Sequence, residues 1–231
     1  MLLAADVALR LLQPWVELRI GVLTALFLVQ SRGTARLGAL FGPIALLWFG
    51  VLAALGIASL VKTPSVLAAF NPVWAVRFFA EHGIRGIVVL GGVFLVATGA
   101  EAIYADLGHF GAAVIRRTWF AVAFPALLLN YLGQGALLLR SPLAAEHPFY
   151  LLVPSVLMVP VLLIATVATC IASQAVITGA FSLTQQAIQL GYLPRLQVRH
   201  TSGEERGQIY IPEINYLLLG LTVLVVGVFR T

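Results

Sequence analysis

Charged residues are scarce in this chain of 231 residues: they make up 10% of the sequence, against 61% for hydrophobic residues. Soluble domains carry about 25% charged residues, so the composition excludes an ordinary soluble domain. There is one cysteine, Cys170, and an intramolecular disulfide is therefore excluded. The net charge is +5, but the basic residues are scattered without interleaved aromatic residues, which argues against nucleic-acid binding.

In place of charged residues the sequence has long hydrophobic runs, and its mean hydropathy is +1.00. Several runs approach the roughly 20 apolar residues that a helix needs to cross a bilayer. Runs such as 122–129 and 159–168 lack the alternation of barrel strands. Because a chain in lipid must satisfy its own backbone, we expect an all-α, polytopic transmembrane helical bundle. We expect a single integral membrane domain over residues 1–231 without a soluble domain.

The apolar runs predict about six spans. Their approximate ranges are 14–30, 37–61, 84–103 with a break near 98–111, 119–139, 155–180 and 211–229. Between the second and third spans, Asn71-Pro72 is typical of a helix start. A short helix over 73–81 would then lie at the membrane interface, with Trp74 as an anchor and Arg77 among the headgroups.

The stretch around which the chain is organised is Thr98-Gly-Ala-Glu-Ala-Ile-Tyr-Ala-Asp-Leu-Gly-His109. Acidic side chains at bilayer depth are costly, and they are functional candidates by default. If the third helix enters the hydrocarbon near Ile87, Glu101 lies roughly 21 Å deeper, inside a core about 30 Å thick. Thr98 and Tyr104 are each three residues away and share its helix face.

Asp106 falls on another face of an unbroken helix, whereas Gly99 and Gly108 allow a break. Broken membrane helices expose carbonyl oxygens that coordinate cations. Carboxylate, hydroxyl and carbonyl oxygens suit a hard cation rather than a transition metal, which prefers nitrogen and sulfur ligands. Desolvation also favours the protonated form of a glutamate. Glu101 is therefore a candidate for binding either a monovalent cation or H⁺.

A structural alternative stays open for this stretch. A continuous helix over 84–103 also has the length of a span, and Glu101 would then reach the interface, followed by an ordinary loop. Asn130 and Gln134, four residues apart, are more typical of hydrogen bonds between helices than of ligands. The hydroxyls of Thr166, Thr169 and Ser173 are likewise more typical of packing than of a pathway. No arrangement of nucleophile and base and no phosphate-binding loop occurs, so we predict neither an enzyme nor a cofactor.

Several sequence blocks closely resemble hallmarks of the potassium uptake permease family (KUP/HAK/KT). The first block is the stretch 98–111. The others are Pro125-Ala-Leu-Leu-Leu-Asn-Tyr-Leu-Gly-Gln-Gly-Ala136, Ile171-Ala-Ser-Gln-Ala-Val-Ile177, Gly179-Ala-Phe-Ser-Leu-Thr184 and Gln208-Ile-Tyr-Ile-Pro212. Asn71-Pro-Val-Trp-Ala-Val76 and the stretch from Gln189 to Ser202 fit the family too. The blocks come in the family's order, and the resemblance extends over nearly all of residues 30–220.

The resemblance implies proton-coupled K⁺ uptake, a symport, on the inverted-repeat fold of the amino acid–polyamine–organocation superfamily. It implies that Thr98 and Glu101 bind K⁺ on a broken helix, with no other metal. Glu101 is also the candidate for proton coupling, and Tyr104 and Asp106 are supporting candidates.

One family motif, which resembles Gly-Asp-Ile-Gly-Thr-Ser-Pro and supplies the other half of the ion site, does not occur in this sequence. The matching blocks correspond to about the fourth to the ninth helix of the family. We therefore expect a lone copy to be incomplete, and to need a companion chain that supplies the missing helices, or a homodimer. Two alternatives remain: a truncated membrane remnant that does not transport, and a transporter of another cation or small solute on the same fold.

Overall fold

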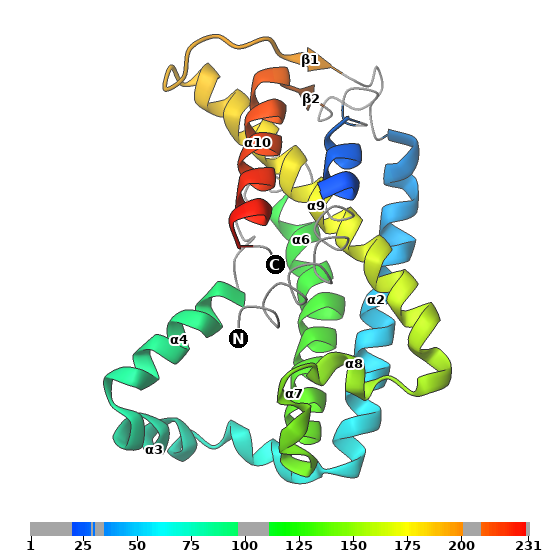
Figure 1. Ribbon diagram of the computed structural model, residues 1–231, viewed down its shortest axis with the longest axis vertical. Coiled ribbons are helices and arrows are strands. Elements are labelled where there is room, and N and C mark those ends of the chain that lie inside the picture. The colour runs from blue at the N-terminus through cyan, green and yellow to red at the C-terminus, as the bar shows by residue number, and fades with distance from the viewer. Residues whose placement is uncertain (1–19, 29, 31–34, 97–110, 201–208, 230–231) are drawn as a thin grey trace, which may run out of the picture. The chain divides into compact units, whose positions relative to one another are not determined.

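Helices account for most of the residues that the computed structural model describes, which are 20–28, 30, 35–96, 111–200 and 209–229 (Figure 1). After a helical segment over 20–28, the α-helices are α2 (Ala35–Lys62), α3 (Val73–His82), α4 (Ile84–Val96), α6 (Ala112–Thr118), α7 (Phe124–Arg140), α8 (Pro148–Leu152), α9 (Met158–Gln189) and α10 (Pro212–Phe229). Shorter turns of helix are η2 (Pro64–Phe70), the π-helical η3 (Trp119–Ala123), η4 (Pro142–Ala145) and η5 (Ser155–Leu157). The expected helical class is confirmed.

Three stretches of helix are long and apolar enough to cross a membrane, judged by length and composition over the described residues. They are Leu40–Lys62 with 23 residues, Ala112–Arg140 with 29 and Ser155–Gln189 with 35. They overlap the second, fourth and fifth expected ranges. Two shorter apolar helices, Ile84–Phe94 and Pro212–Val228, fall in the third and sixth ranges. The count of six spans stays a prediction.

The described chain divides into two compact units, one of residues 40–171 and the other of residues 1–39 with 172–231. In the first unit, Leu55, Val153 and Val161 form a buried core, against which Trp48 and Phe149 pack. The rings of Trp48 and Phe149 meet at an angle of 64° with centroids 5.7 Å apart, the edge-to-face arrangement that aromatic pairs prefer. This core attaches the segment around α8 to α2.

The second unit is built around a different core, formed by Phe27, Ile177, Phe181 and residues 209–211. Ile209 and Tyr210 form a short strand, β2 (Ile209–Tyr210), which pairs antiparallel with β1 (Arg199–His200), and Ile211 follows directly after it. Strands of two residues show no periodicity, so the sequence does not predict them. They matter because they hold Ile209 and Tyr210 against Phe181, whose ring meets that of Tyr210 edge to face at 5.8 Å.

The helix expected over 73–81 is observed as α3. The Asn71 side-chain oxygen accepts a hydrogen bond from the Val73 N–H at 3.0 Å, which satisfies one of the free donors at the helix start. The helix ends at His82 and is followed by Gly83, whose φ of 51° is left-handed and favours glycine. The Asn71 cap is therefore confirmed, and the chain turns directly from α3 into α4.

Candidate functional site

The predicted ion-site residues Thr98, Glu101, Tyr104 and Asp106 lie outside the described residues, and their roles stay predictions. The described chain approaches the stretch through α4, whose one charged residue is Arg85. It resumes at Gly111, which has a φ of 77° and precedes α6. The polar stretch is thus preceded by thirteen residues of apolar helix and followed by a short helix that carries Arg116 and Arg117.

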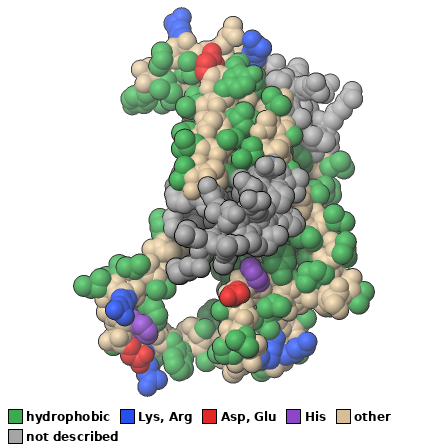
Figure 2. Space-filling model, viewed as in Figure 1, with side chains coloured by type: hydrophobic (Ala, Val, Ile, Leu, Met, Phe, Trp, Pro, Cys, Tyr) green, Lys and Arg blue, Asp and Glu red, His purple; other side chains and the backbone are tan. Residues whose placement is uncertain are grey.

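Apolar side chains face outward along α4. Ile84 is 81% exposed and Phe94 is 75% exposed. On soluble monomers exposed apolar residues are usually scattered singly, whereas those of α4 lie together on one helix. Hydrophobic side chains also dominate the face shown in Figure 2, where charged groups are few. Such a surface suits a hydrocarbon environment.

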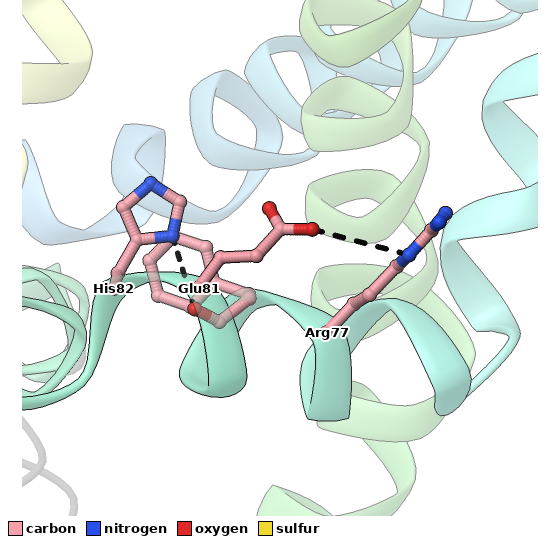
Figure 3. A network of polar contacts seen from close by, with 4 residues as sticks. Arg77, Glu81 and His82 are labelled. Atoms are coloured by element: carbon pink, nitrogen blue, oxygen red, sulfur yellow. Dashed lines mark hydrogen bonds and ion pairs between the residues drawn. The ribbon is translucent and has the colours of Figure 1, made fainter.

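α3 differs from α4 because it combines apolar residues with a polar edge. Glu81 points toward Arg77 at 3.9 Å, and a ring nitrogen of His82 lies 3.0 Å from the Phe78 carbonyl oxygen (Figure 3). The Arg77 guanidinium also lies 5.7 Å from the Trp74 ring centroid, within the range of a cation–π contact. An indole beside a cation is typical of a membrane interface, so this contact supports the expectation that α3 lies at the interface.

A close helix contact in the first unit joins α2 to α7 through two glycines. A Cβ atom added to Gly133 would come within 2.5 Å of the Gly56 Cα, and one added to Gly56 would come within 2.8 Å of the Asn130 nitrogen. Small residues of this kind let membrane helices approach closely. The buried Asn130 belongs to this contact, although no described residue binds its side-chain oxygen.

Polar bonds continue the α2–α7 contact toward the end of both helices. The Ser59 hydroxyl, 4% exposed, donates to the Gly133 carbonyl at 2.8 Å. The Arg140 guanidinium donates to the Ser59 carbonyl at 3.0 Å, to the Ser59 hydroxyl at 2.8 Å and to the Thr63 hydroxyl at 2.6 Å. A positive charge at the C-terminal end of a helix stabilises the exposed carbonyls there. The sequence analysis did not identify these residues; the spacing of Gly56 and Ser59 by three was the available signal.

Two of the hydroxyls on α9, those of Thr166 and Thr169, form hydrogen bonds within the helix. Thr166 and Thr169 donate to the carbonyls four residues earlier, at 2.9 and 2.8 Å. This local bonding is common for threonine in helices. Both residues are exposed, so the packing role and the pathway role both stay predictions.

In the second unit, buried polar side chains join segments far apart in sequence. Gln30 donates to Gln174 of α9, and Asn215 of α10 donates to the Phe27 carbonyl at 3.2 Å. Burial raises the pKa of Tyr210, and the neighbouring Tyr216 raises it further. The hydrogen bonds of Gln30 and Asn215 attach the segment around Phe27 and Gln30 to α9 and α10. Sequence patterns did not reveal them.

Among the described residues, no group of three or more His, Cys, Asp and Glu side chains could hold a metal ion. The apolar helices define the class of this protein, which is a multi-pass helical protein of membranes.

Comparison with known proteins narrows the class to a family. Residues 4–231 match the K⁺ potassium transporter integral membrane domain, and the chain belongs to this family of transporters rather than enzymes. The family resemblance drawn from the motif blocks is confirmed.

Three relatives are each described as a probable potassium transport system protein. The chain is 57% identical to Kup 1 of Syntrophobacter fumaroxidans over 227 residues, which are 98% of this chain and 34% of that protein. It is 58% identical over 213 residues to Kup 1 of Cupriavidus necator and to Kup of Pseudomonas putida strain W619, covering 92% of this chain and 33% and 34% of those proteins. The chain thus spans about a third of the length of these relatives. No solved structure matches it.

Proposed function

We propose that this chain forms the core of a K⁺ importer that takes up K⁺ together with H⁺. The observation that carries the proposal is the match of residues 4–231 to a K⁺ transporter membrane domain. The names of relatives that are 57–58% identical support it. The inverted-repeat fold belongs to the same proposal, as does a companion chain or a second copy that completes the ion pathway.

The proposed ion site consists of Thr98 and Glu101, with Tyr104 and Asp106 in support. One carboxylate neutralises one K⁺, and hydroxyl and carbonyl oxygens replace part of its water shell. Desolvation gives a buried glutamate a raised proton affinity, so Glu101 can bind H⁺ when K⁺ is absent.

A chimeric transporter tests the function. The aligned third of the Pseudomonas putida W619 relative is replaced by this chain, and Rb⁺ uptake is measured in a bacterium deprived of its own K⁺ uptake systems. We expect uptake that a protonophore lowers. Glu101→Gln should reduce it by about tenfold or more, because the cation loses its counter-charge in a low-dielectric site.

Glu81→Gln is the matched control, since Glu81 is an exposed acid on α3 whose contact with Arg77 is an exposed ion pair, worth little. Its uptake should stay within about twofold of the parent. Equal uptake in both variants would remove Glu101 from the mechanism. A chimera that folds and inserts without uptake would favour the non-transporting remnant. Stronger competition by Na⁺, NH₄⁺ or an amino acid than by K⁺ would identify another substrate.

A further inference from the structure

The contact between α2 and α7 leaves no space for sliding. Gly133 and Gly56 meet backbone to backbone, and a Cβ on Gly133 would lie 2.5 Å from the Gly56 Cα and 2.8 Å from its carbonyl oxygen. Any axial shift of one helix would bring a residue larger than glycine into this position. Packed interfaces of this kind have discrete arrangements rather than a continuous range.

Hydrogen bonds fix the same contact along its length. Ser59 is buried and donates to the Gly133 carbonyl, so separation of the helices would take this acceptor away from the Ser59 hydroxyl in an apolar setting. The Arg140 guanidinium donates to three oxygens of Ser59 and Thr63. The planar fork of arginine holds several acceptors in one geometry, which lysine cannot do.

The connection that follows α2 packs on α7 as well. Val66 of η2 is buried, and a Cβ on Gly135 would lie 3.1 Å from its Cγ2 atom. The η2 turn is itself joined to the end of α2, since the Thr63 N–H donates to the Leu60 carbonyl at 3.1 Å and the Val66 N–H to the Thr63 carbonyl at 3.3 Å. α2 and η2 therefore contact α7 at three successive levels: the glycines, the Ser59–Arg140 bonds and Val66.

We propose that α2, η2 and α7 move as one rigid body during the transport cycle, with Arg140 as the residue that positions the end of α2 on α7. The conformational changes of transport then occur at other contacts. The inference rests on the proposed transport function where it concerns the cycle, whereas the rigidity of the body stands on the contacts alone.

A disulfide between η2 and α7 tests the inference during transport. In the chimera, with Cys170 and any other cysteine replaced by serine, Val66→Cys and Gly135→Cys are combined. The 3.1 Å distance from the added Cβ to Val66 Cγ2 is close to the roughly 3 Å between the Cβ of one cysteine and the sulfur of the other in a disulfide. The single variants are the controls, and gel mobility reports the extent of cross-linking.

We expect the oxidised double variant to keep Rb⁺ uptake within about twofold of its reduced form, because a bond inside a rigid body blocks no motion. Loss of uptake on oxidation with recovery in reductant would overturn the inference, and so would failure of the pair to form a disulfide. If the reduced variant and its parent both lack uptake, the transport function has failed instead, and the second measurement decides about rigidity.

The second measurement needs no transport. Spin labels at the exposed positions Leu47 of α2 and Leu139 of α7 report the distance between the helices in nanodiscs that contain the 231-residue chain. We expect one narrow distance distribution, unchanged by K⁺. Arg140→Gln should broaden it, and Arg140→Lys should restore it in part. A broad or K⁺-dependent distribution in the parent would contradict the rigid body.

Discussion

Replacing Gly133 by alanine tests the central helix contact of the first unit. The added Cβ would lie 2.5 Å from the Gly56 Cα, whereas ordinary contact begins at 3.4 Å. Relief of the clash therefore requires a local separation of about 0.9 Å. The same movement would stretch the Ser59–Gly133 hydrogen bond from 2.8 Å to about 3.7 Å, beyond hydrogen-bonding distance.

Three contributions set the change in the free energy of unfolding: two destabilise the variant and one stabilises it. Overpacking costs about 1–3 kcal/mol, and loss of a hydrogen bond inside a membrane protein costs about 0.6 kcal/mol. Alanine recovers up to about 1 kcal/mol of helix propensity. We therefore expect Gly133→Ala to lower the free energy of unfolding by about 1–2 kcal/mol.

Gly50→Ala is the matched control, because an added Cβ there meets nothing within 4 Å. This variant should be neutral or more stable by up to about 1 kcal/mol. Unfolding of both variants is measured by titration with a denaturing detergent in mixed micelles. Equal stability of Gly133→Ala and Gly50→Ala would refute the close backbone contact.

Three further predictions concern other parts of the chain. Phe181→Ala should lower the free energy of unfolding by about 3–5 kcal/mol, since Phe181 is 1% exposed. Leu183, on the same helix, is 38% exposed, so Leu183→Ala should lower the free energy of unfolding much less in the same titration. Tyr210 should titrate above its ordinary pKa of 10.0, so its burial stabilises the fold below pH 10 and this contribution declines as pH rises through the raised pKa. Tyr210→Phe should remove one tyrosine's share of the absorbance change above pH 10, and an unchanged titration curve there would contradict the assignment. With the other tryptophans replaced by phenylalanine, the fluorescence of Trp74 should be quenched most by lipids that are brominated near the headgroups. If lipids brominated deep in the acyl chains quench it most, or if no lipid quenches it, α3 does not lie at the interface.

The sequence predicted the features that depend on local composition. Long apolar runs produced the long helices, and Asn71 produced the cap of α3 because a side-chain oxygen at that position can accept the N–H of a residue in the first turn. The family followed from ordered motif blocks, each of which is a short string. None of these features requires knowledge of which helices are neighbours.

The sequence did not predict features that depend on pairs of distant residues. In the sequence, Arg140 is a basic residue just after the fourth apolar run. In the structure, two of its three acceptors belong to Ser59 of α2, a helix that ends 78 positions earlier, and the third is the Thr63 hydroxyl. In the sequence nothing distinguishes Gly56 and Gly133 from other glycines, because their contact depends on how the two helices pack. The strands β1 and β2 are too short for any period. Each of these features is fixed by tertiary packing, which a single sequence does not display.

The start of α4 bears directly on the proposed ion site. α4 begins at Ile84, directly after the turn at Gly83, which is where the apolar run of the third expected span also begins. If α3 lies at the interface, the 13 residues of α4 reach about 20 Å into a core of about 30 Å.

An uninterrupted helix would carry Glu101 roughly 7 Å further, within reach of the opposite headgroups by extension of its side chain. A deep carboxylate therefore requires that the helix be interrupted between Val96 and Glu101. Interfacial quenching of Trp74 together with loss of uptake in Glu101→Gln would support that interruption. Interfacial quenching with normal uptake is what a continuous span predicts, because an acid in the headgroups is solvated and contributes little to cation binding.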